Sequence, residues 1–307
     1  MPLIIGMSLA IQRVSKTVNC SLFLFGVGMC VSQGHDLFLR PESYQAKPNS
    51  SLKILVFNGS FEESVNTLQP GSVDKTEMRG PSKQEILNTS SWESVDAGSK
   101  LWRASQETAG ILGGTNLRHT SSFAVTPDKP GSYVLGMTLK AYRIALALEP
   151  FDEYLKTDAY SDIELADHGF DSSNDQVKER YTKLAKTIIQ VGDKISDKVI
   201  EPLGLLVEIV PMTNPSLVHK GDVFEFRLLN EGEPLINQAV VVGRKMGAFR
   251  SSENSQMVIH SNAEGIVSLP ITHPGNWWLK FIHLEAALEE DTMDFISRWA
   301  SLTFEIN

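Results

Sequence analysis

The chain has 307 residues, of which 42% are hydrophobic and 21% are charged. This length and apolar share suffice for about two packed domains and exclude a wholly disordered chain. The formal net charge of −9 excludes the overall basic character that binding to nucleic acid or to an anionic lipid surface favours. We therefore expect no nucleic-acid partner.

Residues 1–34 have the order of a secretory signal peptide. Arg13 and Lys16 come first with no acidic residue, an apolar run covers 21–31 (SLFLFGVGMCV), and small residues occupy the first and third places of 32–34 (SQG). The apolar run is short and rich in glycine, which disfavours a membrane span. An uncleaved membrane anchor stays open as the alternative.

Cleavage after Gly34 would make His35 the first residue of the mature protein, and the mature protein would then span no membrane. Both cysteines, Cys20 and Cys30, would leave with the leader, so no disulfide, cysteine metal site or cysteine nucleophile would remain. An exported chain without cysteine fits the bacterial periplasm. A lipoprotein signal at Cys30 is a weaker alternative, because Met29 beside it is a poor match.

Residues 35–149 predict an N-terminal β-sandwich domain. The segment 51–57 (SLKILVF) is rich in residues that favour strands, and it ends at Asn58-Gly59, a strong turn signal. The stretch 62–100 is polar and irregular, which predicts long loops around short strands.

Residues 150–203 predict a partly helical connector. Apolar residues recur at helical spacing over 177–189, and Gly192 can end the helix. These apolar residues are Val177, Tyr181, Leu184, Ala185, Ile188 and Ile189. A solvated helix face is expected for the basic residues between them, which are Lys178, Arg180, Lys183 and Lys186.

Residues 204–307 predict a C-terminal β-sandwich domain, because several apolar strands follow one another at short spacing with glycine turns. Trp277 and Trp278 are neighbours, so in a strand they point to opposite faces. The expected fold is therefore mainly β, with two immunoglobulin-like or prealbumin-like β-sandwich domains joined by the partly helical connector.

Four parts of the mature chain occur in a characteristic order and spacing. They are 35–41 (HDLFLRP), 151–155 with 179–186, 206–215 with 221–222 and 232–235, and 274–278 with 283–285 and 299–305. Together they resemble a bacterial periplasmic domain-of-unknown-function family known as a nickel or cobalt uptake component (NikM-like). The resemblance implies export, binding of a divalent transition metal and hand-over at an inner-membrane metal transporter. The polar stretch 62–100 departs from the pattern, and nothing is carried over there.

His35 is the main candidate metal ligand. An N-terminal histidine offers its α-amine and its ring nitrogen to one metal, and the amine has a pKa of about 8. Imidazole suits nickel, cobalt and copper. His283 is the favoured second ligand and His119 the runner-up, while Asp36 and Glu285 can add oxygen ligands. The alternative is that His35 only starts a strand and His283 is a hydrogen-bonded structural residue.

Catalytic motifs are missing from the sequence. It contains no G-x-S-x-G nucleophile elbow, no Walker loop and no H-E-x-x-H pair. His168 lies among acidic residues in a segment that we expect to be a solvated loop. We therefore expect a non-catalytic exported metal-binding protein without an organic cofactor. The alternatives are an envelope interaction module without metal, and a copper-dependent oxidative enzyme with His35 as an N-terminal brace.

Overall fold

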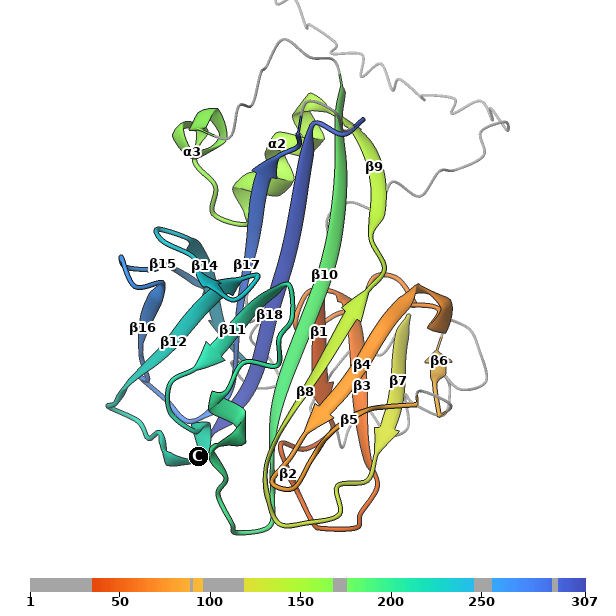
Figure 1. Cartoon of the computed structure of the whole chain (residues 1–307), viewed down its shortest axis with the longest axis vertical. Helices are drawn as coiled ribbons and strands as arrows, with labels where there is room; N and C mark the ends of the chain where they lie inside the picture. Colours follow the sequence, from red (N-terminus) through yellow and green to blue (C-terminus); the bar gives the residue numbers. More distant parts are fainter. Residues whose placement is uncertain (1–34, 89–90, 96–118, 168–175, 246–255, 289–291) are drawn as a thin grey trace, which may run out of the picture. The chain divides into compact units, whose positions relative to one another are not determined.

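The computed structural model describes residues 35–88, 91–95, 119–167, 176–245, 256–288 and 292–307 (Figure 1). These segments all belong to one compact unit. The expected signal peptide, both cysteines and His168 lie outside the described residues. In the part of the chain that is described, no helix has the length and apolar character needed to cross a bilayer.

A ten-stranded sheet forms the centre of the fold (Figure 1). Eight strands follow one another in the order β15 (Met257–His260), β14 (Ala239–Arg244), β17 (Gly275–Ala286), β18 (Phe295–Ile306), β10 (Gln176–Val191), β8 (Gly131–Leu139), β4 (Val73–Arg79) and β5 (Gln84–Ile86). The short strand β2 (Gln45–Ala46) and strand β9 (Tyr142–Ala147) also pair with β10. The sheet thus joins strands from both halves of the chain, and β10 lies where the halves meet.

Two four-stranded sheets pack against opposite faces of this central sheet. The first comprises β1 (Asp36–Pro41), β3 (Leu52–Gly59), β7 (Thr120–Val125) and β6 (Glu93–Val95). The second comprises β11 (Val207–Pro211), β12 (Val223–Asn230), β13 (Glu233–Pro234) and β16 (Ile266–Pro270). Each sheet encloses an apolar core with the central sheet. The mainly β, sandwich-type fold is as predicted, and the two sandwiches share β10.

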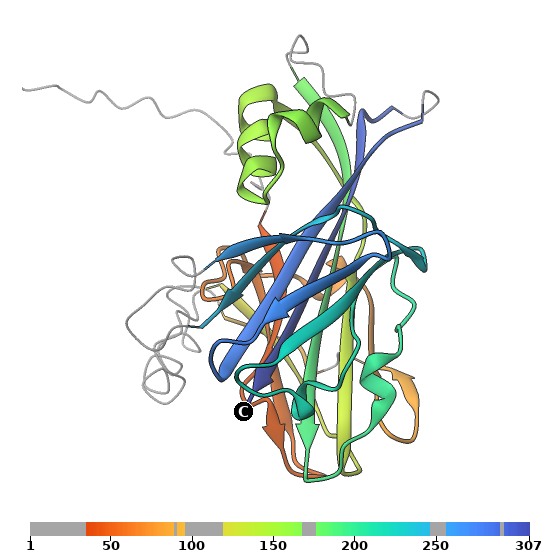
Figure 2. The ribbon, with the colours of Figure 1, turned by 90° about the vertical axis from the view of Figure 1, so that its left-hand side faces the viewer.

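Within the described residues, five short helical segments lie between the strands. They are the 3₁₀ helices η1 (Pro70–Ser72), η2 (Asp197–Ile200) and η3 (Pro215–Leu217), and the α-helices α2 (Leu148–Thr157) and α3 (Asp162–Asp167). Figure 2 shows α2 and α3 at one end of the long strands β10, β17 and β18. Phe151, Tyr154 and Leu155 of α2 pack there against residues of β17 and β18 in a third apolar cluster. The connector is therefore helical in its first part only.

The helix predicted over 177–189 is wrong, because this segment is the sixteen-residue strand β10. Ala185 and Ile189 face the core of the first sandwich, whereas Leu184 and Ile188 face the core of the second. A strand buried on both faces is apolar at odd and even positions alike, and the combined set imitates helical spacing. The prediction that the basic residues of this segment form a solvated face is wrong for Lys183 and Lys186, which are both buried.

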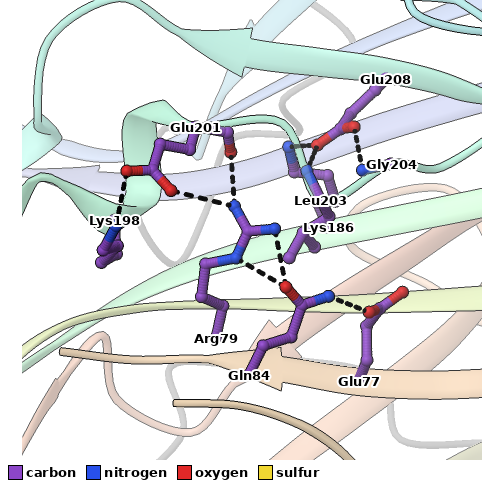
Figure 3. Close-up of polar contacts among 9 residues, drawn as sticks. All are labelled: Glu77, Arg79, Gln84, Lys186, Lys198, Glu201, Leu203, Gly204 and Glu208. Atoms are coloured by element: carbon purple, nitrogen blue, oxygen red, sulfur yellow. Dashed lines mark hydrogen bonds and ion pairs between the residues drawn. The ribbon is translucent and has the colours of Figure 1, made fainter. Parts of the chain in front are cut away.

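A buried ion pair joins the second four-stranded sheet to the central sheet (Figure 3). Lys186 Nζ of β10 lies 2.6 Å from Glu208 Oε1 of β11 and also donates to the Ile209 carbonyl at 2.9 Å. The Glu208 carboxylate accepts backbone N–H groups from Leu203 at 2.7 Å and Gly204 at 3.1 Å. All charged atoms of the pair are thus engaged, as a buried ion pair requires.

Candidate functional site

A group of polar side chains is enclosed where β1 begins, between the first four-stranded sheet, the end of α2 and the central sheet. We call it the N-terminal polar cluster. Its members are His35, Asp36, Asn58, Asp158, Glu179, Lys183 and Lys280. Strand alternation aims the β10 and β17 members at the same face of the central sheet, so charges distant in sequence meet in one place.

Lys183 of β10 is the innermost cation of this cluster, with 3% of its surface exposed. Its Nζ donates to the main-chain carbonyl of His35 and lies 3.3 Å from Asn58 Oδ1. The rings of Tyr181 and Trp299 each lie 5.3 Å from this nitrogen, which suits a cation–π contact. Burial lowers the pKa of Lys183 to about 8, against the opposing effect of nearby carboxylates.

Lys280 of β17 lies between two carboxylates. Its Nζ is 2.7 Å from Asp36 Oδ2 and also contacts Asp158 Oδ1 at the end of α2. Burial alone would lower the pKa of Lys280, but Asp36 and Asp158 together raise it above its usual value. Burial raises the pKa of Asp158 to about 6, although Lys280 opposes this shift.

Glu179 closes the cluster on the side of the helices. It accepts hydrogen bonds from the Tyr154 hydroxyl at 2.6 Å and from the Ser297 hydroxyl. Burial raises the pKa of Glu179, and these two hydrogen bonds and Lys183 oppose the shift. The carboxylate is therefore held by α2 and β18 and is not free to coordinate a ligand.

His35 is half-buried at the edge of the cluster. Burial and the neighbouring Lys183 lower the pKa of its imidazole, while Asp36 opposes them. A lowered pKa leaves the ring neutral at pH 7, which is the form that binds a metal. The bond from Lys183 to the His35 carbonyl fixes the main chain at the same residue.

The structure does not bring His283 and Glu285 to His35. Both lie on the face of β17 opposite to Lys280, because residues three and five positions away from it in a strand point the other way. Glu285 Oε1 lies 3.0 Å from His283 Nε2, and Glu285 Oε2 lies 2.6 Å from the guanidinium of Arg298. That carboxylate is therefore engaged by a cation of its own.

His119 is also separated from His35. It precedes β7, and the pairing of β3 with β7 places it across from Asn58. Because β3 lies between β1 and β7, and Asn58 pairs with Leu37 of β1, a whole strand and a shift along β1 separate the two histidines. Among the described residues, no three His, Cys, Asp or Glu side chains are grouped so that they can hold a metal ion. The five predicted ligands therefore do not form one site.

Sequence reasoning missed the charged core of the cluster. Lys183 was assigned to a solvated face, and Lys280, Asp158 and Glu179 were given no role. One signal was available in 277–282 (WWLKFI), where a single lysine interrupts an apolar strand sequence. A lone lysine inside such a run must find a partner when the strand is buried.

These features define a mainly β, sandwich-type protein with charged residues enclosed between its layers. The chain belongs to the family described as Domain of unknown function (DUF4198), whose model matches residues 32–285. No curated protein matches this sequence.

Solved structures show only distant similarity. Latent PorU from Porphyromonas gingivalis has 8% identity and a TM-score of 0.21, covering 94% of this chain and 22% of that chain. Trypsin-activated alpha-2-macroglobulin from Escherichia coli has 9% identity and a TM-score of 0.19, covering 91% and 16%. Murine CEACAM1b has 9% identity and a TM-score of 0.19, covering 89% and 99%. The chain therefore spans less than a quarter of the first two structures.

Proposed function

We propose that this protein is exported to the periplasm, binds a divalent transition metal at His35 and supports uptake of metals of the nickel and cobalt class. The observation that carries the proposal is the state of His35. Its imidazole has a lowered pKa, and its main chain is fixed by Lys183 where the folded strand begins. Removal of the leader would add a free α-amine beside this neutral ring, and the two groups chelate a metal together.

The surrounding charges limit the site to these two donors. Asp36 is bound by Lys280, and Glu285 is bound by Arg298 on the other face of β17. A metal held by one amine and one imidazole keeps several coordination positions open to water or to another protein. Such binding is readily exchanged, which suits hand-over to a membrane transporter better than permanent storage.

Calorimetry on the mature protein tests this proposal. Protein beginning at His35 should bind nickel, cobalt or copper ions, and a form with one extra glycine before His35 should lose binding because its amine is displaced. His35→Ala should lose binding as well. His283→Ala is the matched control and should bind like the wild type. Equal affinity of the glycine-extended form would refute the role of the amine.

Export and uptake need separate measurements. Mass spectrometry of the protein from the periplasmic fraction should find His35 at the N-terminus. Cells that lack the protein should accumulate less nickel or cobalt from poor medium, and the wild-type gene but not the His35→Ala gene should restore uptake. Normal accumulation in the deletion strain would contradict a role in uptake.

A further inference from the structure

The N-terminal polar cluster contains a lysine and two aspartates in a reactive arrangement. Lys280 Nζ contacts Asp158 Oδ1 and lies 2.7 Å from Asp36 Oδ2. Lys280 is 7% exposed and Asp158 is 3% exposed. An amine and two carboxyl groups thus meet in a place that excludes most water.

The surroundings of Lys280 are apolar along its own strand. Trp278 and Ile282 lie two residues before and after it, point to the same face of β17 and are both buried. The main chain that carries Asp158 is also fixed, because its N–H ends α2 by donating to the carbonyls of Leu155 and Lys156. Neither group can move away from the other without disturbing a packed element.

We propose that Lys280 and Asp158 join in an intramolecular isopeptide bond, with Asp36 carrying the protons. One proton of the Lys280 ammonium passes through Asp36 to the Asp158 carboxylate, which leaves a neutral amine beside a neutral carboxyl group, and the amine lone pair then attacks Cγ of Asp158. The new bond is N–Cγ, and the bond that breaks joins Cγ to the protonated oxygen. A second proton passes from the nitrogen through Asp36 to that oxygen, which leaves as water, and the amide keeps the third proton. Asp36 ends as it began, and nothing is oxidised or reduced.

Three features of the site favour this reaction. Fixed reactants behave as if they were at a concentration far above any attainable in solution. Burial raises the pKa of Asp158, which favours its neutral carboxyl group, the form more readily attacked than a carboxylate. Asp36 is near enough to the lysine nitrogen to take its protons directly.

The second buried lysine–carboxylate pair has a different set of partners and provides an internal control. Glu208 accepts hydrogen bonds from three backbone N–H groups, those of Leu203, Gly204 and Leu205. Lys186 donates to Glu208 and to the Ile209 carbonyl, so no second carboxylate contacts its nitrogen in the part of the chain described here. We therefore expect Lys186 and Glu208 to stay an ion pair.

The intact mass of the purified mature protein, measured under denaturing conditions, tests the proposal. The mass should be lower than that of the sequence by one water molecule. Fragmentation of a protease digest should give a branched peptide that joins Lys280 to Asp158. A wild-type mass equal to that of the sequence, or a water loss located at other residues, would overturn the proposal whether or not any variant folds.

Variants assign the roles. Asp158→Ala should have the full mass of its sequence because the electrophile is gone, and Asp36→Asn should have it because the proton carrier is gone. Lys186→Met should still lose one water. Retention of the water loss in Asp158→Ala would disprove the bond, and its retention in Asp36→Asn would disprove the part assigned to Asp36.

Discussion

The ion pair between Lys186 and Glu208 offers a sharp test of how the second four-stranded sheet is held against the central sheet. Lys186→Met keeps a long apolar side chain but leaves the Glu208 carboxylate buried without a cation. Glu208→Gln keeps an oxygen for the backbone N–H groups but leaves the Lys186 ammonium without an anion. Both residues are 1% exposed, so water cannot replace the missing partner.

The magnitude follows from the distance and the burial. At 2.6 Å between Nζ and Oε1, the attraction is about 6 kcal/mol for an effective dielectric constant of about 20. Desolvation of both ions offsets much of this energy in the intact pair. When one partner is removed, the other keeps its desolvation penalty. We expect each single substitution to lower the free energy of unfolding by about 3–5 kcal/mol.

A double-mutant cycle in urea measures the coupling. The double variant Lys186→Met/Glu208→Gln buries no uncompensated charge, so we expect its free energy of unfolding to lie within about 2 kcal/mol of the wild type. The coupling energy between the two sites should be about 3 kcal/mol or more. Additive effects, or a loss below about 1 kcal/mol in Lys186→Met, would refute the reasoning.

Three further predictions concern other parts of the molecule. The pKa of Lys183 is about 8 in the folded protein, and its ordinary value is 10.5. Between these pH values the unfolded chain binds more protons than the folded protein, so the free energy of unfolding should increase by about 3 kcal/mol as the pH rises. Denaturation across this range should show the rise in the wild type and not in Lys183→Met; parallel curves would contradict it. Metal affinity at His35 should rise with pH up to about 8, where the α-amine loses its proton. Calorimetry at several pH values measures this affinity, and a constant affinity above pH 6 would contradict the prediction. Gly243→Ala would place a Cβ 2.2 Å from a ring atom of Trp278, and it should lower the free energy of unfolding by about 1–3 kcal/mol. Gly71→Ala is the control, because its Cβ would meet nothing within 4 Å. Equal melting temperatures of the two variants would exclude the clash.

Part of the architecture was predictable from local patterns. The strand predicted over 51–57 is β3, which covers all but its first residue. The turn predicted at Asn58-Gly59 is wrong, because both residues still pair with β1 and the chain turns only after them. Trp277 and Trp278 do point to opposite faces of β17, and they enter different apolar clusters. The polar stretch 62–100 does contain short strands, β4, β5 and β6. In each case the signal lies within a few neighbouring residues.

The candidate site was only partly predictable. Residues 35 and 36 were selected, and the structure places both at the edge of the N-terminal polar cluster. His283 was selected as a partner of His35 because both belong to stretches that resemble one family. Its side chain nevertheless points to the opposite face of β17, since a side chain's face depends on its register in the strand. The pairing of Lys280 with Asp36 joins residues far apart in the chain, so no pattern in the neighbouring sequence indicates it.

Composition, turn residues and apolar segments were enough to predict a mainly β chain of sandwich type, because these features act through neighbouring residues. The tertiary structure decided that 176–191 is a strand and that Lys183, Lys186 and Lys280 lie inside. Burial on both faces makes a strand apolar without alternation, and only packing against two different sheets reveals both faces. Charges enter such a core only where a partner from a distant segment meets them, so their positions are fixed by the fold and not by their neighbours in sequence.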